Sequence, residues 1–152
     1  MIFLTGSSGF IGSNFAKYYI ENNIKFRGID KKKNNYLDSK YFIKLDLLNK
    51  KKLFKLFAKY KPKIVLHLAA DSGLNYCHLN QNQSFKNNVE ATFNLLQSCV
   101  KYSCKNILMA SSMAAENYNE NPSFYGFTKI TSENLLNTYR KKYGLNSTIL
   151  RF

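Results

Sequence analysis

Short apolar runs alternate along this chain with longer segments whose apolar residues recur at helical spacing. The runs 2–5, 64–68 and 107–111 are short and mainly apolar, as strands are, and 64–68 has the apolar character of a strand buried on both faces. Between them, apolar residues fall three or four positions apart, which is the spacing of one helix face. The pattern predicts βαβ units, and therefore an α/β fold with a doubly wound parallel sheet.

Six strands and four long helices are predicted in one domain, residues 1–152. The strands are expected at 2–5, 25–30, 41–45, 64–68, 107–111 and 147–152. The helices are expected at 12–22, between Asn49 and Pro62, at 84–102 and at 123–143, with loops between them. Because the sixth strand closes the sequence, a C-terminal substrate domain is expected to be lacking.

Composition indicates a globular protein without a membrane anchor. Hydrophobic residues make up 45% of the 152 positions, and no apolar run approaches the roughly 20 residues that span a bilayer. No secretory signal precedes the first strand, which predicts a cytoplasmic protein. Three cysteines without a Cys-x-x-Cys pair, Cys77, Cys99 and Cys104, predict reduced thiols and no metal site.

The net charge of +14 raises nucleic-acid binding as one hypothesis. The excess comes mainly from lysines scattered along the chain, including the runs 31–33 and 50–52. Scattered lysines are typical of a solvated surface, so no nucleic-acid partner is predicted.

Three glycines between the first strand and the first helix form the series G-x-x-G-x-x-G. They are Gly6, Gly9 and Gly12. In a dinucleotide-binding unit such glycines allow a tight turn, close approach of the backbone to a pyrophosphate, and close packing of the helix on the sheet. The helix N-terminus then favours the negative charge. A purely structural turn remains the alternative.

Two acidic residues end the next two strands. Asp30 lies 18 positions after Gly12, where its carboxylate can accept hydrogen bonds from the adenosine ribose and repel a 2′-phosphate. This favours NAD over NADP, although a cation such as Lys31 beside that ribose could accommodate the phosphate. Asp46-Leu47 closes the third strand, either beside an adenine or as a cap of the following helix.

A phenol and an ammonium lie four residues apart on the last helix. On a helix Tyr125 and Lys129 share one face, and the ammonium is expected to lower the pKa of the phenol toward neutrality. Such a tyrosine can exchange a proton with a substrate hydroxyl. Ser111-Ser112, at the end of the fifth strand, can hydrogen-bond the reacting oxygen.

These motifs together resemble the extended short-chain dehydrogenases/reductases, within the NAD-dependent epimerase/dehydratase group. The resemblance implies a Rossmann-type NAD(P)-binding fold. It is carried, in family order, by Thr5-Gly6-Ser7-Ser8-Gly9-Phe10-Ile11-Gly12, Asp30, Asp46-Leu47, His67-Leu68-Ala69-Ala70, Asn88-Val89, Ala110-Ser111-Ser112, Tyr125-x-x-x-Lys129 and Leu150-Arg151-Phe152.

The resemblance also implies roles for individual residues. Ser112, Tyr125 and Lys129 would form the catalytic triad, and NAD would be the cofactor. The residues expected to bind the cofactor are Gly6, Ser8, Gly9, Phe10, Ile11, Gly12, Asp30, Lys31, Asp46, Leu47, Leu68, Ala69, Ala70, Asn88, Ser111, Tyr125 and Lys129.

Within that group the chain is most similar to the nucleotide-sugar 4-epimerases. The resemblance implies a nucleotide-sugar substrate, transient hydride transfer at a sugar carbinol, and a possible homodimer through the 84–102 helix. Met113-Ala114 stand where dehydratases carry an Asp-Glu pair, which disfavours dehydration. The alternatives are a sugar-nucleotide reductase or dehydratase, and an inactive NAD-binding fragment, since family members are about twice as long.

Overall fold

Six parallel strands form one sheet in the computed structural model, which describes residues 1–33 and 37–152. The strand order β3-β2-β1-β4-β5-β6 is that of a Rossmann fold, as predicted. Residues 34–36 of the predicted 31–40 loop lie outside the described residues. The strands are β1 (Ile2–Thr5), β2 (Phe26–Asp30), β3 (Phe42–Lys44), β4 (Ile64–His67), β5 (Asn106–Ser111) and β6 (Asn146–Arg151).

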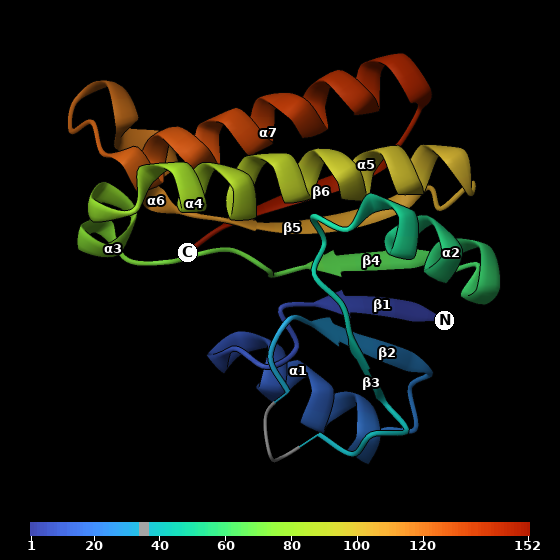
Figure 1. Cartoon of the computed structure of the whole chain (residues 1–152). Coiled ribbons are helices and arrows are strands. Elements are labelled where there is room, and N and C mark those ends of the chain that lie inside the picture. Colours follow the sequence, from blue (N-terminus) through green and yellow to red (C-terminus); the bar gives the residue numbers. More distant parts are fainter. Residues whose placement is uncertain (34–36) are drawn as a thin grey trace.

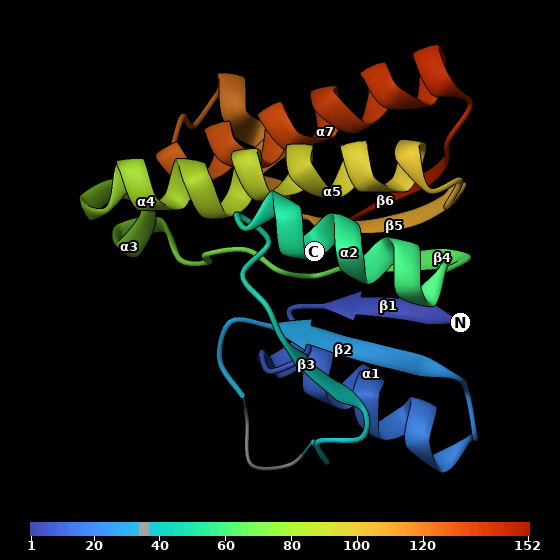
Figure 2. The same cartoon turned by 45° about the vertical axis from the view of Figure 1, so that its right-hand side comes forward.

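Helices cover both faces of the sheet. The four long ones are α1 (Phe10–Glu21), α2 (Lys50–Tyr60), α5 (Ala91–Lys101) and α7 (Phe124–Tyr143). Helix α1 lies on one side of the sheet, and α2, α5 and α7 lie on the other, with α5 and α7 side by side (Figures 1 and 2). Since every strand points the same way, all strand C-termini meet at one edge.

Adjacent residues of β1 show how the strands separate two cores. Phe3 points toward α2 and α5, where its ring meets the ring of Phe57 edge-on at 5.1 Å between centroids. Leu4 points the other way, into the smaller core under α1 that contains Ala16. Strands buried on both faces therefore read as unbroken apolar runs.

The ends of the predicted helices follow their capping residues. The Asn49 side chain accepts the Lys52 backbone N–H at 3.0 Å and begins α2. Ser123 accepts the Gly126 N–H at 3.0 Å and begins α7, and Gly144, at φ +66°, ends it.

The prediction of a polar loop over 69–83 was wrong in part. Two short helices, α3 (Leu74–Leu79) and α4 (Gln81–Phe85), occupy this stretch, and a π-helical turn at Lys86–Glu90 joins α4 to α5. Helix α3 buries one side chain, Cys77, so it carries no apolar stripe that a periodicity analysis could detect. The helix predicted at 84–102 therefore belongs to a longer helical segment that begins at Gln81.

The apolar residues spaced four apart around the π-helical turn differ in burial. Val89 is buried, whereas Phe85 and Phe93 are 41% and 36% exposed. Helix α5 itself packs between α2 and α7. The homodimer through residues 84–102 stays a prediction.

Residues after β5 were expected to form a loop, and they begin with a short helix. Ser112 is the N-cap of α6 (Met113–Glu116), and its Oγ accepts the Ala114 N–H at 3.3 Å. A 3-10 turn at Asn117–Asn119 follows. Strand β5 therefore ends at Ser111, one residue before Ser112.

The three cysteines are buried free thiols. Across residues 1–33 and 37–152, the structure contains no helix with the length and apolar character that a membrane crossing requires.

Replacing Gly12 by alanine is expected to lower the free energy of unfolding by about 2–3 kcal/mol. A Cβ at this position would lie 2.1 Å from the Gly6 carbonyl oxygen, which is backbone and cannot rotate away. Urea denaturation measures the change. Gly9→Ala is the control, because its Cβ would approach nothing closer than 3.4 Å, and its cost should stay below about 1 kcal/mol. Equal losses for the two variants would contradict this account.

Candidate functional site

Backbone packs directly on backbone where β1 turns into α1. Gly6 has φ +70°, and a Cβ there would lie 2.6 Å from the Ala69 amide nitrogen. A Cβ at Gly12 would collide with Gly6. The turn therefore lies flush against the segment that follows β4.

The N-terminus of α1 is open to an anion. Its N-cap, Gly9, provides no side-chain cap, and its first turn holds no acidic residue. By contrast, Asn49 and Ser123 cap α2 and α7 with their side chains. The first backbone N–H groups of a helix have no partner within the helix, so a bound anion could accept from them here. The contacts within the protein do not require glycine at position 9, so the missing side chain leaves room for close approach from outside.

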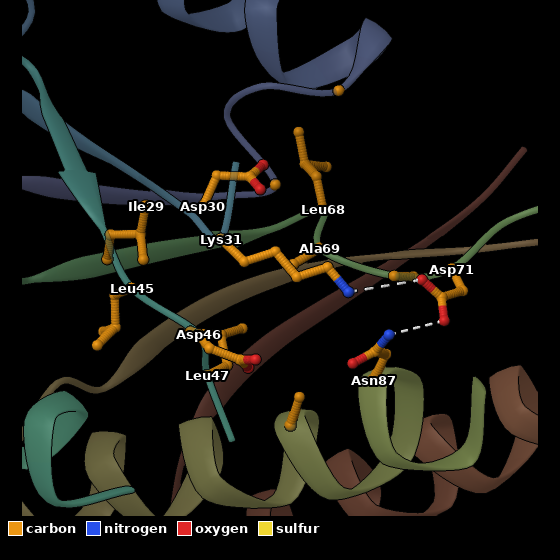
Figure 3. A pocket seen from close by; sticks show the side chains of 14 residues that line it. Ile29, Asp30, Lys31, Leu45, Asp46, Leu47, Leu68, Ala69, Asp71 and Asn87 are labelled. Atoms are coloured by element: carbon orange, nitrogen blue, oxygen red, sulfur yellow. Dashed lines mark hydrogen bonds and ion pairs between the residues drawn. The ribbon is translucent and has the colours of Figure 1, made fainter. Parts of the chain in front are cut away.

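Two pockets meet at this turn and share Gly6, Gly9, Leu68 and Ala70. The pocket on the β2 side is lined by Gly6, Gly9, Ile29, Asp30, Lys31, Leu45, Asp46, Leu47, Leu68, Ala69, Ala70, Asp71, Asn87 and Ala91 (Figure 3). The pocket on the β5 side is lined by Gly6, Gly9, Phe10, Ile11, Gly12, Leu68, Ala70, Ser72, Ala110, Ser111, Ser112, Tyr125, Lys129 and Phe152. Together they form one groove across the C-terminal edge of the sheet. Every site residue predicted from the sequence lines this groove, apart from Ser8 and Asn88.

Ser8 and Asn88 support the groove from behind its wall. The Ser8 N–H donates to Asp30 Oδ2 at 3.0 Å, and its hydroxyl donates to the Lys32 carbonyl. Asn88, buried, donates to the Asp71 carbonyl and to Thr128 Oγ1, each at 3.0 Å. These contacts join the glycine turn to β2, and the loop after β4 to α7.

The carboxylate that ends β2 is oriented by backbone donors. Asp30 Oδ1 accepts the Lys32 N–H at 3.1 Å, in addition to the bond from Ser8. Asp46 Oδ1 accepts the Leu48 N–H at 2.9 Å in the turn before α2, whereas Asn49 caps that helix. The cap is thus Asn49, as predicted, and not Asp46, for which capping was the alternative role. Asp46 lines the β2-side pocket.

Tyr125, Lys129 and Ser112 converge on the β5-side pocket. Lys129 is 7% exposed, its Nζ donates to the Ala110 carbonyl at 3.1 Å, and it lies 5.6 Å from the centroid of the Tyr125 ring. Burial lowers the pKa of this lysine to about 8. Tyr125 and Lys129 lie on one face of α7, as their spacing predicts.

The predicted lowering of the Tyr125 pKa was wrong. Burial raises the pKa of this phenol above 10, and a side-chain hydrogen bond with Ser112 only partly offsets that rise. Helical spacing indicates that two residues share a face, but it does not indicate how strongly burial penalises the phenolate. In the structure, the phenol at neutral pH is therefore the protonated form.

A charge cluster centred on the buried Glu133 lies one helical turn beyond Lys129. Glu133 accepts from Arg151 Nη2 at 2.7 Å and from Arg151 Nε at 3.0 Å, and the Ser111 hydroxyl also donates to it. Burial alone would raise the pKa of Glu133, but these hydrogen bonds lower it. The cluster ties α7 to β6. Because the Ser111 hydroxyl is used here, its contact with a cofactor stays a prediction.

Three polar residues in or beside the groove that were not predicted as site residues come from one segment of the chain: Asp71, Asn87 and Cys77. Asp71 and Asn87 line the β2-side pocket, and the buried Cys77 is an electrostatic neighbour of Tyr125 and Lys129. All three lie between β4 and α5, the segment whose short helices escaped the analysis. The sequence signals next to them are His67-Leu68-Ala69-Ala70, immediately before Asp71, and Asn88-Val89, immediately after Asn87.

Comparison with known proteins gives consistent matches. The model of the NAD dependent epimerase/dehydratase family matches residues 2–152. UDP-glucuronate 4-epimerase 1 of Arabidopsis thaliana is 29% identical over 99% of this chain and 41% of its own length. The chain spans about half the length of the curated relatives it matches.

Solved structures give the same picture of the fold. UDP-glucose 4-epimerase from Brucella ovis in complex with NAD superposes with a TM-score of 0.91 at 28% identity, over 99% of this chain and 50% of that one. L-threonine dehydrogenase of Clostridium difficile superposes with a TM-score of 0.89 at 25% identity, over 99% of this chain and 52% of that one.

The Lys129 ammonium is expected to titrate near pH 8. Nuclear magnetic resonance of the lysine Cε resonances measures this, with Lys129→Met identifying the signal by its loss. Burial removes the water that would stabilise the ammonium form, and this lowers the pKa of Lys129 from the ordinary lysine value near 10.4. A midpoint at that ordinary value would contradict the burial seen in the structure.

Proposed function

Because the chain belongs to the NAD dependent epimerase/dehydratase family, we propose that it binds NAD along the groove and that the protein is a nucleotide-sugar 4-epimerase. The proposal rests chiefly on one observation: the open N-terminus of α1 and the Ser112, Tyr125 and Lys129 side chains share one continuous groove. The epimerases among the relatives act on UDP-glucose and UDP-glucuronate by name, which supports a UDP-sugar as substrate.

The groove residues fit a dinucleotide. The uncapped first turn of α1 would hold the pyrophosphate, and the space at Gly9 would allow its close approach. Asp30, oriented by two backbone donors, would accept hydrogen bonds from the adenosine ribose. Apolar side chains such as Leu45 and Leu47 would contact the adenine. The nicotinamide end would then reach the β5-side pocket.

In that pocket, the phenolate form of Tyr125 would accept the proton of the sugar hydroxyl as the hydride leaves the carbinol carbon, and would return it when the hydride returns. Since burial keeps the phenol protonated at neutral pH, Tyr125 would first have to release its own proton to solvent. NAD, when bound, supplies a hydride acceptor at the carbinol carbon. The Ser112 hydroxyl, hydrogen-bonded to the phenol, would orient the reacting oxygen. Lys129 is held toward the pocket by its bond to the Ala110 carbonyl, where its ammonium would bind the ribose on the nicotinamide side.

A dehydrogenase is the second candidate, since the fold also matches L-threonine dehydrogenase closely. The two reactions differ in whether the hydride returns to the substrate. A 4-epimerase interconverts two epimers without net accumulation of NADH, whereas a dehydrogenase accumulates one NADH for each substrate oxidised. An NAD-binding protein without catalysis would bind the dinucleotide and do neither.

Gly9→Ala is expected to raise the dissociation constant for NAD at least about tenfold, while the fold stays intact. The added methyl group would fit without a clash and would project from the wall shared by both pockets. Isothermal titration calorimetry of the 152-residue chain measures the affinity, and circular dichroism checks the fold. Unchanged affinity in the alanine variant would argue against a pyrophosphate at this turn.

Tyr125→Phe is expected to reduce turnover of UDP-glucose about 10²–10⁴-fold, because the variant has no proton to exchange. Affinity for NAD should stay within about twofold of that of the unsubstituted protein. The measurement uses protein expressed from its complete reading frame, with epimer formation followed by chromatography. Turnover at the original rate would remove Tyr125 from the mechanism. The matched control is Tyr76→Phe, which makes the same change at an exposed tyrosine on α3.

A further inference from the structure

The β2-side pocket carries a charge opposite to that of the rest of the chain. Three of the nine acidic residues line it, Asp30, Asp46 and Asp71, and one of the 23 lysines and arginines does, Lys31. The residues outside the description, 34–36, are uncharged and do not alter this balance. A basic protein thus presents a net negative pocket where the adenosine would lie.

Lys31, the basic residue of the described pocket lining, extends its side chain away from Asp30. Lys31 directly follows Asp30, but its Nζ lies 4.0 Å from Asp71 Oδ1. Figure 3 shows the lysine side chain extended across the pocket toward that carboxylate. Asp71 comes from the segment after β4, so the ion pair spans the pocket from the β2 side to the β4 side.

Asp71 is held in place from several directions. Its Oδ2 accepts from Asn87 Nδ2 at 2.7 Å, and Gln83 Nε2 donates to Asn87 Oδ1 at 3.0 Å. Its backbone N–H donates to Asn88 Oδ1, and its carbonyl accepts from Asn88 Nδ2. The side chain of Asp71 is only 15% exposed, whereas that of Lys31 is 44% exposed. The carboxylate is therefore the fixed partner and the lysine the movable one.

We propose that Asp71 determines the preference for NAD over NADP by holding Lys31 away from the adenosine ribose. The inference rests on the proposed binding of NAD. A 2′-phosphate needs a nearby cation, and Lys31 is the only basic residue of the described pocket lining. With Lys31 held at Asp71, the phosphate would meet the Asp30 carboxylate without compensation. Release of Lys31 would supply that cation.

The test compares NAD and NADP affinities by calorimetry in the 152-residue chain and its variants. Asp71→Asn removes the charge but retains an acceptor for Asn87, so the pocket wall stays supported. The ratio of NADP to NAD affinity is expected to rise about three- to tenfold, as suits a partly exposed ion pair. In the double variant that carries both Asp71→Asn and Lys31→Ala, the ratio of NADP to NAD affinity should not rise. Adding Lys32→Ala, the same change one residue further on, should leave the gain intact.

Lys31→Ala alone gives a second measure that does not depend on a substitution of Asp71. Because Asp71 already holds Lys31 away from the ribose, this variant should bind NADP no more weakly than the unsubstituted chain. An unchanged ratio in Asp71→Asn, a gain that survives Lys31→Ala, or a loss of NADP affinity in Lys31→Ala alone would each overturn the inference. If the unsubstituted chain binds neither dinucleotide, the proposed function fails, and the inference fails with it.

Discussion

The contact between the β1–α1 turn and its neighbours leaves no room for a single side-chain carbon. Gly12 lies against the Gly6 carbonyl, and Gly6 lies against the backbone of Ala69. This contact brings the start of α1 next to the segment after β4, and the groove forms along the line where they meet. Its two pockets share Gly6 and Gly9 for that reason. The position of the groove thus follows from a steric requirement in the first twelve residues.

The local charge of the groove differs in sign from the net charge of the chain. The net charge of +14 suggests a polyanion partner, yet the β2-side pocket concentrates a third of the acidic residues. One helical turn from Lys129, the buried Glu133 pairs with the more exposed Arg151 and ties α7 to β6. Local placement, rather than the total, decides which ligands the groove can accept.

The sequence predicted those parts of the fold that carry a periodic or steric signal. The parallel strands, the long helices, Asn49 as a cap and the glycine turn all have such a signal, and the structure contains them. Helix α3 carries none, because Cys77 is its only buried residue. The pKa of Tyr125 depends on burial, which a spacing of four residues does not report. The role of Asp71 could not be predicted from the sequence, because it depends on contacts with Asn87, Asn88 and Lys31 that form only in the folded chain.

The π-helical turn at 86–90 makes chain length in this segment as important as residue identity. It lets two consecutive residues, Asn87 and Asn88, serve the same neighbour, one bonding the Asp71 carboxylate and the other its backbone. Deleting one residue here would restore α-helical winding and rotate α4 relative to α5. One asparagine would then turn away from Asp71. The segment should tolerate many side-chain exchanges on its outer surface, but no change in the number of its residues.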